Sequence, residues 1–139
     1  MRPPLLFDSH ALLKFFQREP GAEEVALLLR EARDANVDRL LCIINLGEIL
    51  YLTKRRFGES KKLEVVGRIH QMGIKTLSAS DSLVFRAAEL KAEHAISYAD
   101  CFALACAREH SAVLVTGDPE FKQVSHLVTI EWVGKKEKD

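Results

Sequence analysis

The stretch Leu114-Val115-Thr116-Gly117-Asp118-Pro119-Glu120-Phe121 decides the fold class of this chain. Residues 112–115 are a short apolar run with β-branched side chains, which is typical of a buried strand. Thr116 and Gly117 then turn the chain, and Asp118 followed by Pro119 is the pattern of a helix start, with Asp as the N-cap and Pro in the first helical position. The sequence therefore predicts a carboxylate at the carboxyl end of a strand, where open α/β sheets bind their ligands.

The rest of the chain repeats this alternation of short apolar runs and amphipathic segments. Further strands are predicted over residues 4–7, 40–44, 74–77 and 127–133. Helices are predicted from Asp8 to Pro20, over 22–35, from Asn45 as N-cap to Phe57, over 59–72, after Ser80, and from Ser97. The last of these is apolar on almost every side, which is typical of a buried helix. This alternation predicts a parallel, helix-covered α/β sheet.

Length and composition limit the classes of protein that the chain can belong to. At 139 residues it is expected to form one domain over residues 1–134, followed by a charged tail over 135–139. Its 20 Lys and Arg residues balance 20 Asp and Glu residues, so no global field attracts nucleic acid. Three cysteines without CxxC spacing predict reduced thiols in the cytoplasm. No apolar run approaches the ~18 residues that span a membrane.

Three acids lie just after predicted strands. Asp8 follows residues 4–7, Asp118 follows residues 112–115, and Glu48 lies soon after residues 40–44, in the most apolar part of the chain. Because parallel strands end at the same edge of a sheet, these three acids are expected to approach one another. Asp100 opens the helix that precedes residues 112–115. It needs tertiary packing to join the other three, and spacing alone does not place it.

Each acid also has a purely structural explanation. Asp8 and Asp118 can be N-caps, and Asp100 lies three residues after Ser97, close to a capping box. Glu48 can be a solvated position on an otherwise buried helix. Taken together, however, clustered carboxylates repel by about 4 kcal/mol per pair at ~4 Å and an effective dielectric near 20. A hard divalent cation removes that repulsion, and oxygen ligands favour Mg²⁺ or Mn²⁺ over zinc.

Four segments give the chain a family resemblance. They are Leu6-Phe7-Asp8-Ser9, Asn45-Leu46-Gly47-Glu48-Ile49, Ser97-Tyr98-Ala99-Asp100-Cys101-Phe102-Ala103-Leu104-Ala105 and Thr116-Gly117-Asp118-Pro119-Glu120-Phe121. In this order and with this strand and helix pattern, the chain resembles the PIN-domain family, and among its members the VapC-type ribonuclease toxins of toxin–antitoxin pairs. The resemblance implies a three-layer α/β/α sandwich with a mainly parallel central sheet. It also implies a Mg²⁺- or Mn²⁺-dependent endoribonuclease.

The resemblance further implies a set of site residues. The acids of the family fall on Asp8, Glu48, Asp100 and Asp118, as metal ligands or, for Glu48, as an alternative general base. The family often has Thr or Ser three residues before its Glu, where this chain has Asn45. Thr116 would orient the site through its hydroxyl group. The implied partners are an RNA substrate, a cognate antitoxin protein and a second copy in a homodimer.

Other polar residues near these motifs have less specific explanations. Glu120 is a possible auxiliary acid, although a solvated helix position is the preferred interpretation. His10 is interpreted as a partly exposed structural residue and is left out of the site. Basic residues near the acids could bind substrate, and most are better explained as a solvated face. They are Lys14, Arg18, Lys54, Arg55, Arg56, Lys61 and Lys62.

Alternative functions remain open from the sequence. One is a PIN nuclease that processes RNA without an antitoxin. Another is a catalytically silent interaction domain whose acids only cap helices. Two other metal-dependent folds fit poorly, because a haloacid-dehalogenase-type phosphohydrolase needs an Asp where this chain has His10, and a phospho-receiver domain needs an Asp after the third strand, where Leu77 is followed by Ser78.

Overall fold

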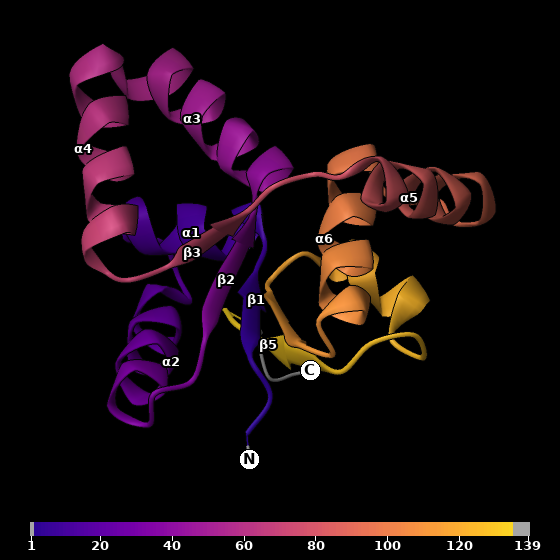
Figure 1. Cartoon of the computed structure of the whole chain (residues 1–139). Helices are drawn as coiled ribbons and strands as arrows, with labels where there is room; N and C mark the ends of the chain where they lie inside the picture. Colours follow the sequence, from indigo (N-terminus) through magenta and orange to yellow (C-terminus); the bar gives the residue numbers. More distant parts are fainter. Residues whose placement is uncertain (1, 135–139) are drawn as a thin grey trace.

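Strands and helices alternate along the chain in the computed structural model, which describes residues 2–134 (Figure 1). The strands are β1 (Leu5–Phe7), β2 (Arg39–Cys42), β3 (Lys75–Leu77), β4 (Val113–Thr116) and β5 (Ile130–Trp132). The α-helices are α1 (Ser9–Phe16), α2 (Ala22–Asp34), α3 (Ile43–Phe57), α4 (Glu59–Gln71), α5 (Asp81–Glu93) and α6 (Tyr98–Glu109). A 3₁₀ helix, η1, covers Pro119–Val124. The charged tail predicted over residues 135–139 lies outside the described residues.

All five strands are parallel and form one sheet in the order β3-β2-β1-β4-β5. From β1 the chain continues to β2 and β3 on one side, whereas β4 and β5 lie on the other. Strand β1 pairs with β4 through Leu5 with Val113, Leu6 with Leu114 and Phe7 with Val115. The sheet therefore has its topological switch point between β1 and β4, and ligands of open α/β sheets bind in the crevice outside the carboxyl ends of such a strand pair.

Alternate residues of the central strands face two separate cores. Leu6, Leu40 and Leu114 belong to the core beneath α5 and α6. Phe7 and Val115, the next residues of β1 and β4, belong to the core beneath α1, α2 and α4. A sheet that is covered on both faces needs apolar residues at successive positions, which explains the unbroken apolar runs of the sequence.

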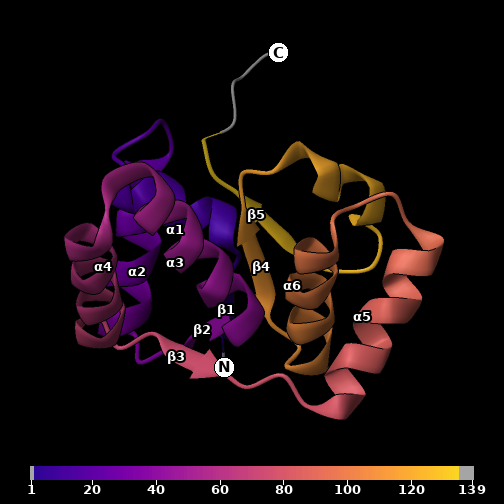
Figure 2. The same cartoon turned by 90° about the horizontal axis from the view of Figure 1, so that it is seen from above.

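Helices cover the sheet on both faces, so the fold is a three-layer α/β/α sandwich. Figure 2 shows α1–α4 on one side of the strands and α5 and α6 on the other. The apolar stripes of α1 and α2 face the sheet, with Leu12, Phe16, Val25 and Leu29 buried. Residues 100–107 of α6 are all buried, which confirms the prediction that this helix lies inside the molecule. The predicted α/β fold class is confirmed.

The structure corrects the predicted boundary between β2 and α3. Ile43 and Ile44 were predicted as the end of a strand, but they form the first turn of α3, and Cys42 is its N-cap. Asn45 is therefore the third residue of the helix and not its cap. A short β-branched run fits a strand or a buried helix equally well, and periodicity cannot separate the two. Predicted strand 127–133 is likewise shorter, because only Ile130–Trp132 pairs as β5.

A helix that crosses a membrane must be both long and apolar. Within residues 2–134, none combines the length and the apolar character that crossing a bilayer requires.

Candidate active site at the carboxyl edge of the sheet

Asp8 lies where β1 ends and α1 begins, and it is fully buried. Its Oδ1 accepts a hydrogen bond of 2.8 Å from the backbone N–H of Ala11. Asp8 is therefore the N-cap of α1, the structural role that the sequence also predicts for it. Its Oδ2 accepts a hydrogen bond of 2.5 Å from the Thr116 hydroxyl. Each carboxylate oxygen has a second lone pair, so capping leaves Asp8 able to bind a further partner.

Thr116 connects the ends of the two central strands. It is the last residue of β4 and is completely buried. Its hydroxyl donates to Asp8 and accepts a hydrogen bond of 2.9 Å from the backbone N–H of Asp118. One hydroxyl group therefore fixes the carboxylate after β1 and the backbone of the turn after β4.

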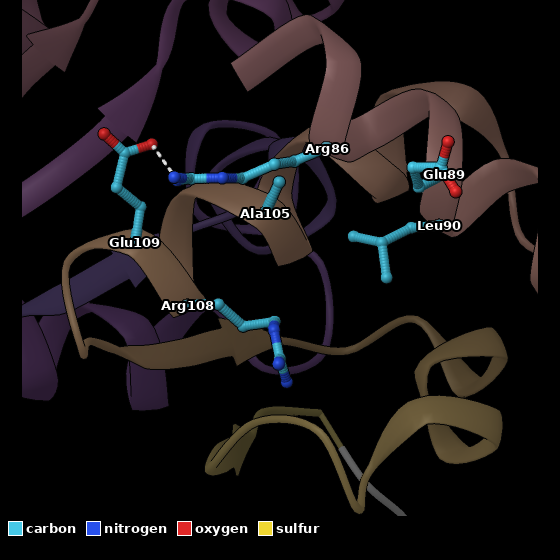
Figure 3. Close-up of a pocket in the computed structure, with 6 residues that line it drawn as sticks. All are labelled: Arg86, Glu89, Leu90, Ala105, Arg108 and Glu109. Carbon is cyan, nitrogen blue, oxygen red and sulfur yellow. Dashed lines mark ion pairs between the residues drawn. The ribbon is translucent and has the colours of Figure 1, made fainter. Parts of the chain in front are cut away.

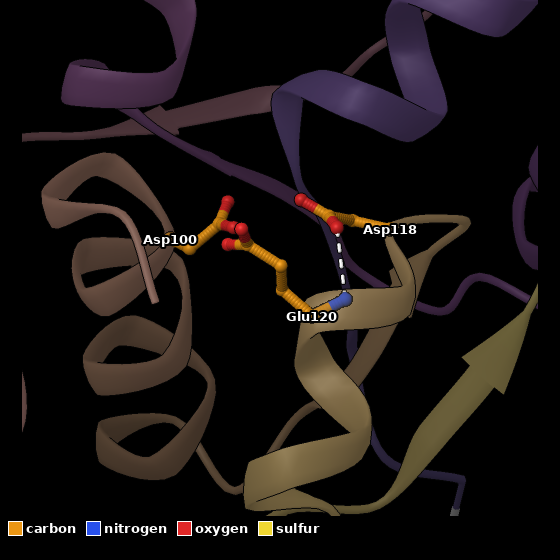
Figure 4. Close-up of side chains that lie close together, drawn as sticks. All are labelled: Asp100, Asp118 and Glu120. Atoms are coloured by element: carbon orange, nitrogen blue, oxygen red, sulfur yellow. Dashed lines mark hydrogen bonds between the residues drawn. The ribbon is translucent and has the colours of Figure 1, made fainter. Parts of the chain in front are cut away.

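Three carboxylates gather where α6 and η1 begin. One oxygen from each of Asp100, Asp118 and Glu120 lies within 4.8 Å of the other two. Figure 4 shows Asp100 reaching from α6 toward the two acids at the start of η1. Asp118 caps η1 by accepting a hydrogen bond of 2.9 Å from the N–H of Glu120. The sequence left open whether Asp100 joins the other acids. The structure shows that tertiary packing brings it to Asp118.

The structure places Glu120 differently from the solvated helix position that the sequence favours. Its side chain is exposed, as a solvated helix position would be, but its carboxylate belongs to the three-acid group. The reason is that residues 119–124 form a tight 3₁₀ helix, whose first residues stay close to the N-cap Asp118. In the sequence, the spacing of Asp118 and Glu120 across a capped helix start was the signal that could have identified Glu120 as a member of this group.

Glu48 lies in the second turn of α3, one turn later than the sequence predicted, because α3 begins at Ile43. It is half-buried, and its Oε1 accepts a hydrogen bond of 2.6 Å from the Ser9 hydroxyl at the start of α1. Its negative charge contributes to raising the pKa of Asp8 and of Asp100. Sequence reasoning left Ser9 out of the site, although it directly follows Asp8 and holds Glu48.

Asn45 connects α3 to the start of α6. Its Nδ2 donates a hydrogen bond of 3.2 Å to the carbonyl oxygen of Ala99, the residue before Asp100. Asn45 is completely buried, and within residues 2–134 its Oδ1 has no hydrogen-bond partner. The side chain thus helps to hold the first turn of α6, which carries Asp100, against the helix that carries Glu48.

Crowding and burial disturb the ionisation of two of these acids. The pKa of Asp100 is raised from 3.8 to about 8, mainly by burial and also by a hydrogen bond to Asp118 and by the charges of Asp118, Asp8 and Glu48. Burial also raises the pKa of Asp8 to about 7, against the lowering effect of its bonds from Thr116 and Ala11. At neutral pH, Asp100 and Asp8 in the metal-free protein therefore retain protons that a fully solvated carboxyl group would lose.

The donor set of this site fits a hard divalent cation. The three-acid group consists only of carboxylate oxygens, and Asp8 and Glu48 add negative charge around it. Mg²⁺ and Mn²⁺ prefer such ligands, whereas zinc prefers His and Cys. A cation at this position would offset the repulsion that raises the pKa of Asp100, so the residues present match the chemistry of the metal.

Most of the basic residues that were considered for substrate binding are paired with acids. Lys54 and Lys62 contact Glu59 at 3.4 and 3.0 Å, Lys61 contacts Glu64 at 3.3 Å, and Arg56 contacts Glu19 at 3.8 Å. These pairs are partly or largely exposed, in keeping with a solvated basic face.

A pocket of about 400 Å³ lies between α5 and α6, away from the acids (Figure 3). Arg86 forms an ion pair of 3.4 Å with Glu109 at its wall, and Arg108 donates to the carbonyl oxygen of Leu127. Because its α6 residues lie in the C-terminal half of the helix and Asp100 lies at the start, this pocket is separate from the acid site.

We expect Thr116→Val to lower the free energy of unfolding by about 2 kcal/mol, because it removes a buried hydroxyl that makes two hydrogen bonds and leaves their partners unsatisfied. Thr116→Ser keeps the hydroxyl and should lose much less. Urea unfolding of the three proteins in EDTA measures the difference. A loss in Thr116→Val that is no larger than the loss in Thr116→Ser would contradict a dominant stabilising role of the hydroxyl.

The stability of the metal-free protein should fall as the pH rises from 5 to 8. A carboxyl whose pKa is higher in the folded protein than in the unfolded chain stabilises the fold most at low pH, and this contribution is lost as the pH rises through about 8. The slope is at most about 1.4 kcal/mol per pH unit for each proton retained. Asp100→Asn should flatten the pH dependence measured by thermal unfolding in EDTA, whereas the exposed Asp34→Asn should not. An unchanged slope in Asp100→Asn would contradict the raised pKa.

Comparison with known proteins identifies the family. The family model described as PIN domain matches residues 5–127, which include all of the acids described above. A comparison with curated protein sequences gives no significant match.

Solved structures share the fold at low sequence identity. VapBC2 from Rickettsia felis, bound to a DNA fragment from the VapBC2 promoter, is 17% identical, with a TM-score of 0.76 over 93% of this chain and 98% of that chain. DNA-bound VapBC from Salmonella typhimurium is 16% identical, with a TM-score of 0.71 over 93% and 97%. VapC20 from Mycobacterium tuberculosis, a Sarcin-Ricin loop cleaving toxin, is 14% identical, with a TM-score of 0.69 over 86% and 94%. Since the family model covers most of the chain and the fold agrees with it, this chain belongs to the PIN-domain family.

Proposed function

We propose that this protein is a metal-dependent endoribonuclease that hydrolyses phosphodiester bonds in RNA, and that it is the toxin of a toxin–antitoxin pair. The observation that carries the proposal is the group formed by Asp100, Asp118 and Glu120, with Asp8 and Glu48 close by, at the switch point of a PIN-domain sheet. A purely structural role explains the capping bonds of Asp8 and Asp118. It does not explain why Asp100, a buried acid on another helix, is placed against them.

The acids divide into ligands and supporting groups. Asp100 and Asp118 are proposed as metal ligands, with Glu120 on the exposed side of the same group. Asp8 is proposed as a further ligand whose orientation Thr116 fixes. Asn45 is proposed to support the site by holding the start of α6.

Hydrolysis also needs a group that accepts a proton from the attacking water. Bound Mg²⁺ or Mn²⁺ supplies a water molecule of lowered pKa and stabilises negative charge on the phosphate. Glu48, held by the Ser9 hydroxyl, is proposed as the general base, or as a ligand of a second cation. In either role the hydrogen bond from Ser9 keeps its carboxylate turned toward the start of α1.

The proposed biological setting is a cytoplasmic toxin with an antitoxin partner and a homodimeric assembly. Solved structures with a similar fold include a toxin–antitoxin complex from Klebsiella pneumoniae and VapBC-5 from Mycobacterium tuberculosis, a member of the VapBC family of toxin–antitoxin systems, which supports this setting. The protein also exposes large apolar side chains that a partner could cover, among them Tyr51 on α3, Leu63 on α4 and Phe85 on α5.

Two alternatives lead to different observations. A PIN nuclease of RNA processing would cleave RNA but would have no small neighbouring gene whose product binds and inhibits it. A silent interaction domain would bind neither metal nor RNA at the acids. The buried position of Asp100 beside Asp118 favours a working site over the silent domain, because a domain that uses its acids only as caps has no need of this contact.

We expect wild-type protein to cleave a mixture of structured RNAs in millimolar Mn²⁺, and to lose activity in EDTA. Asp100→Asn should reduce the rate by at least ~100-fold, because it weakens the metal site. Glu64→Gln is the matched control, since Glu64 lies on α4 and, among residues 2–134, pairs only with Lys61. Rates are measured on labelled transcripts by gel electrophoresis. Equal rates in wild type and Asp100→Asn would place the nuclease activity elsewhere.

A further inference from the structure

Lys14 crosses the turn that carries Asp118. It lies on α1, one helical turn after His10, and both side chains cover Gly117, the residue just before Asp118. A Cβ atom added to Gly117 would lie 2.7 Å from Lys14 Cε and 3.2 Å from His10 Nδ1. The same Cβ atom would lie 2.7 Å from the backbone oxygen of Val133, which cannot move aside as a lysine stem can, so the backbone requires glycine here and the Lys14 stem passes directly over the turn that carries Asp118.

Two more glycines border the same side chain. A Cβ atom on Gly21 would lie 3.2 Å from Lys14 Cδ, and one on Gly134 would lie 3.3 Å from Cε and 3.4 Å from Nζ. These contacts follow the lysine stem outward from Cδ to Nζ. Lys14 is half-buried as a result, and its stem has less rotational freedom to lose on binding than that of an exposed lysine.

The ammonium at the end of this stem differs from those of the other lysines that were considered for substrate binding. Within residues 2–134 it forms no ion pair, in contrast to Lys54, Lys61 and Lys62.

We propose that Lys14 is a substrate-binding residue that holds a phosphate group of the RNA beside the metal-binding acids. This inference rests on the proposed nuclease function and adds the cation that the substrate needs. A polyanion that approaches five carboxylates requires local positive charge, and the whole chain has no net charge to supply it. An ammonium whose stem passes Gly117, and which is unpaired with an acid in the part of the chain that the structure describes, provides a charge-assisted contact to a phosphate oxygen.

The test measures RNA binding separately from cleavage. A fluorescein-labelled single-stranded RNA of mixed sequence is titrated with protein in Ca²⁺ and in EDTA, at several salt concentrations. Ca²⁺ is used because it prefers oxygen ligands, as Mg²⁺ does. Gel electrophoresis checks that the RNA stays intact. The variant is Lys14→Met, which keeps an unbranched apolar stem and removes the charge. Its matched control is Lys75→Met, because Lys75 begins β3 at the opposite edge of the sheet and pairs with Asp38 at 3.0 Å.

We expect Lys14→Met to weaken RNA binding in Ca²⁺ by roughly tenfold, as for the loss of one charge-assisted contact. The slope of log affinity against log salt should become shallower by about 0.7, the value for one phosphate contact on a single strand. Lys75→Met should stay within about twofold of wild type, with an unchanged slope. In cleavage assays Lys14→Met should raise KM more than it lowers kcat.

Further measurements separate the possible failures. Lys14→Gln is a second neutral variant in case Lys14→Met folds poorly, and both should bind Mn²⁺ like wild type in calorimetry, since Lys14 is not a ligand. Binding by both variants that equals Lys75→Met would overturn the role of Lys14 and leave the nuclease proposal intact. Wild-type protein that binds no more RNA in Ca²⁺ than in EDTA would overturn the proposed function, and the role of Lys14 with it.

Discussion

The parallel pairing of β1 with β4 is the constraint on which the site depends. These strands meet at the switch point of the sheet, so the residues that follow them, Asp8 and Asp118, reach the same edge although they are far apart in the sequence. The Thr116 hydroxyl converts this pairing into a defined arrangement, because it donates to the Asp8 carboxylate and accepts from the Asp118 backbone. The start of α6, held through Asn45 and Ala99, then adds Asp100.

The resulting arrangement is electrostatically unfavourable in the isolated protein. Burial and neighbouring acids raise the pKa of Asp100 to about 8 and that of Asp8 to about 7, so the fold holds these groups together at a cost to its own stability. The sequence offers partial compensation, because Asp8 and Asp118 each accept a hydrogen bond at a helix start. A divalent cation would supply the remaining positive charge. Sites that sacrifice stability in this way are commonly functional, since a structural role alone would not select for crowded buried acids.

The sequence predicted those features of the fold and site that follow from local pattern and parallel topology. Short apolar runs predicted the sheet, and the acids at strand ends predicted a common edge for Asp8 and Asp118. The sequence could not place Asp100, because its position depends on how α6 packs against α3 through the Asn45 side chain. The boundary at Cys42 and the bond from Ser9 to Glu48 were also missed, because a β-branched run and a lone serine carry no signal of tertiary contacts. Glu120 was given a solvated position because helix periodicity does not describe a 3₁₀ turn.

We propose that a divalent cation completes the site formed by the acids. The most direct measurement is the melting temperature at pH 8 in EDTA and in saturating Mn²⁺, for wild type and for Asp118→Asn. A cation at ten times its dissociation constant adds about 1.4 kcal/mol, which corresponds to a rise of a few degrees in a domain of this size. We expect this rise in wild type and a much smaller one in Asp118→Asn. The same melting temperature of wild type in EDTA and in Mn²⁺ would contradict a metal site and would leave Asp8 and Asp118 with their role as helix caps.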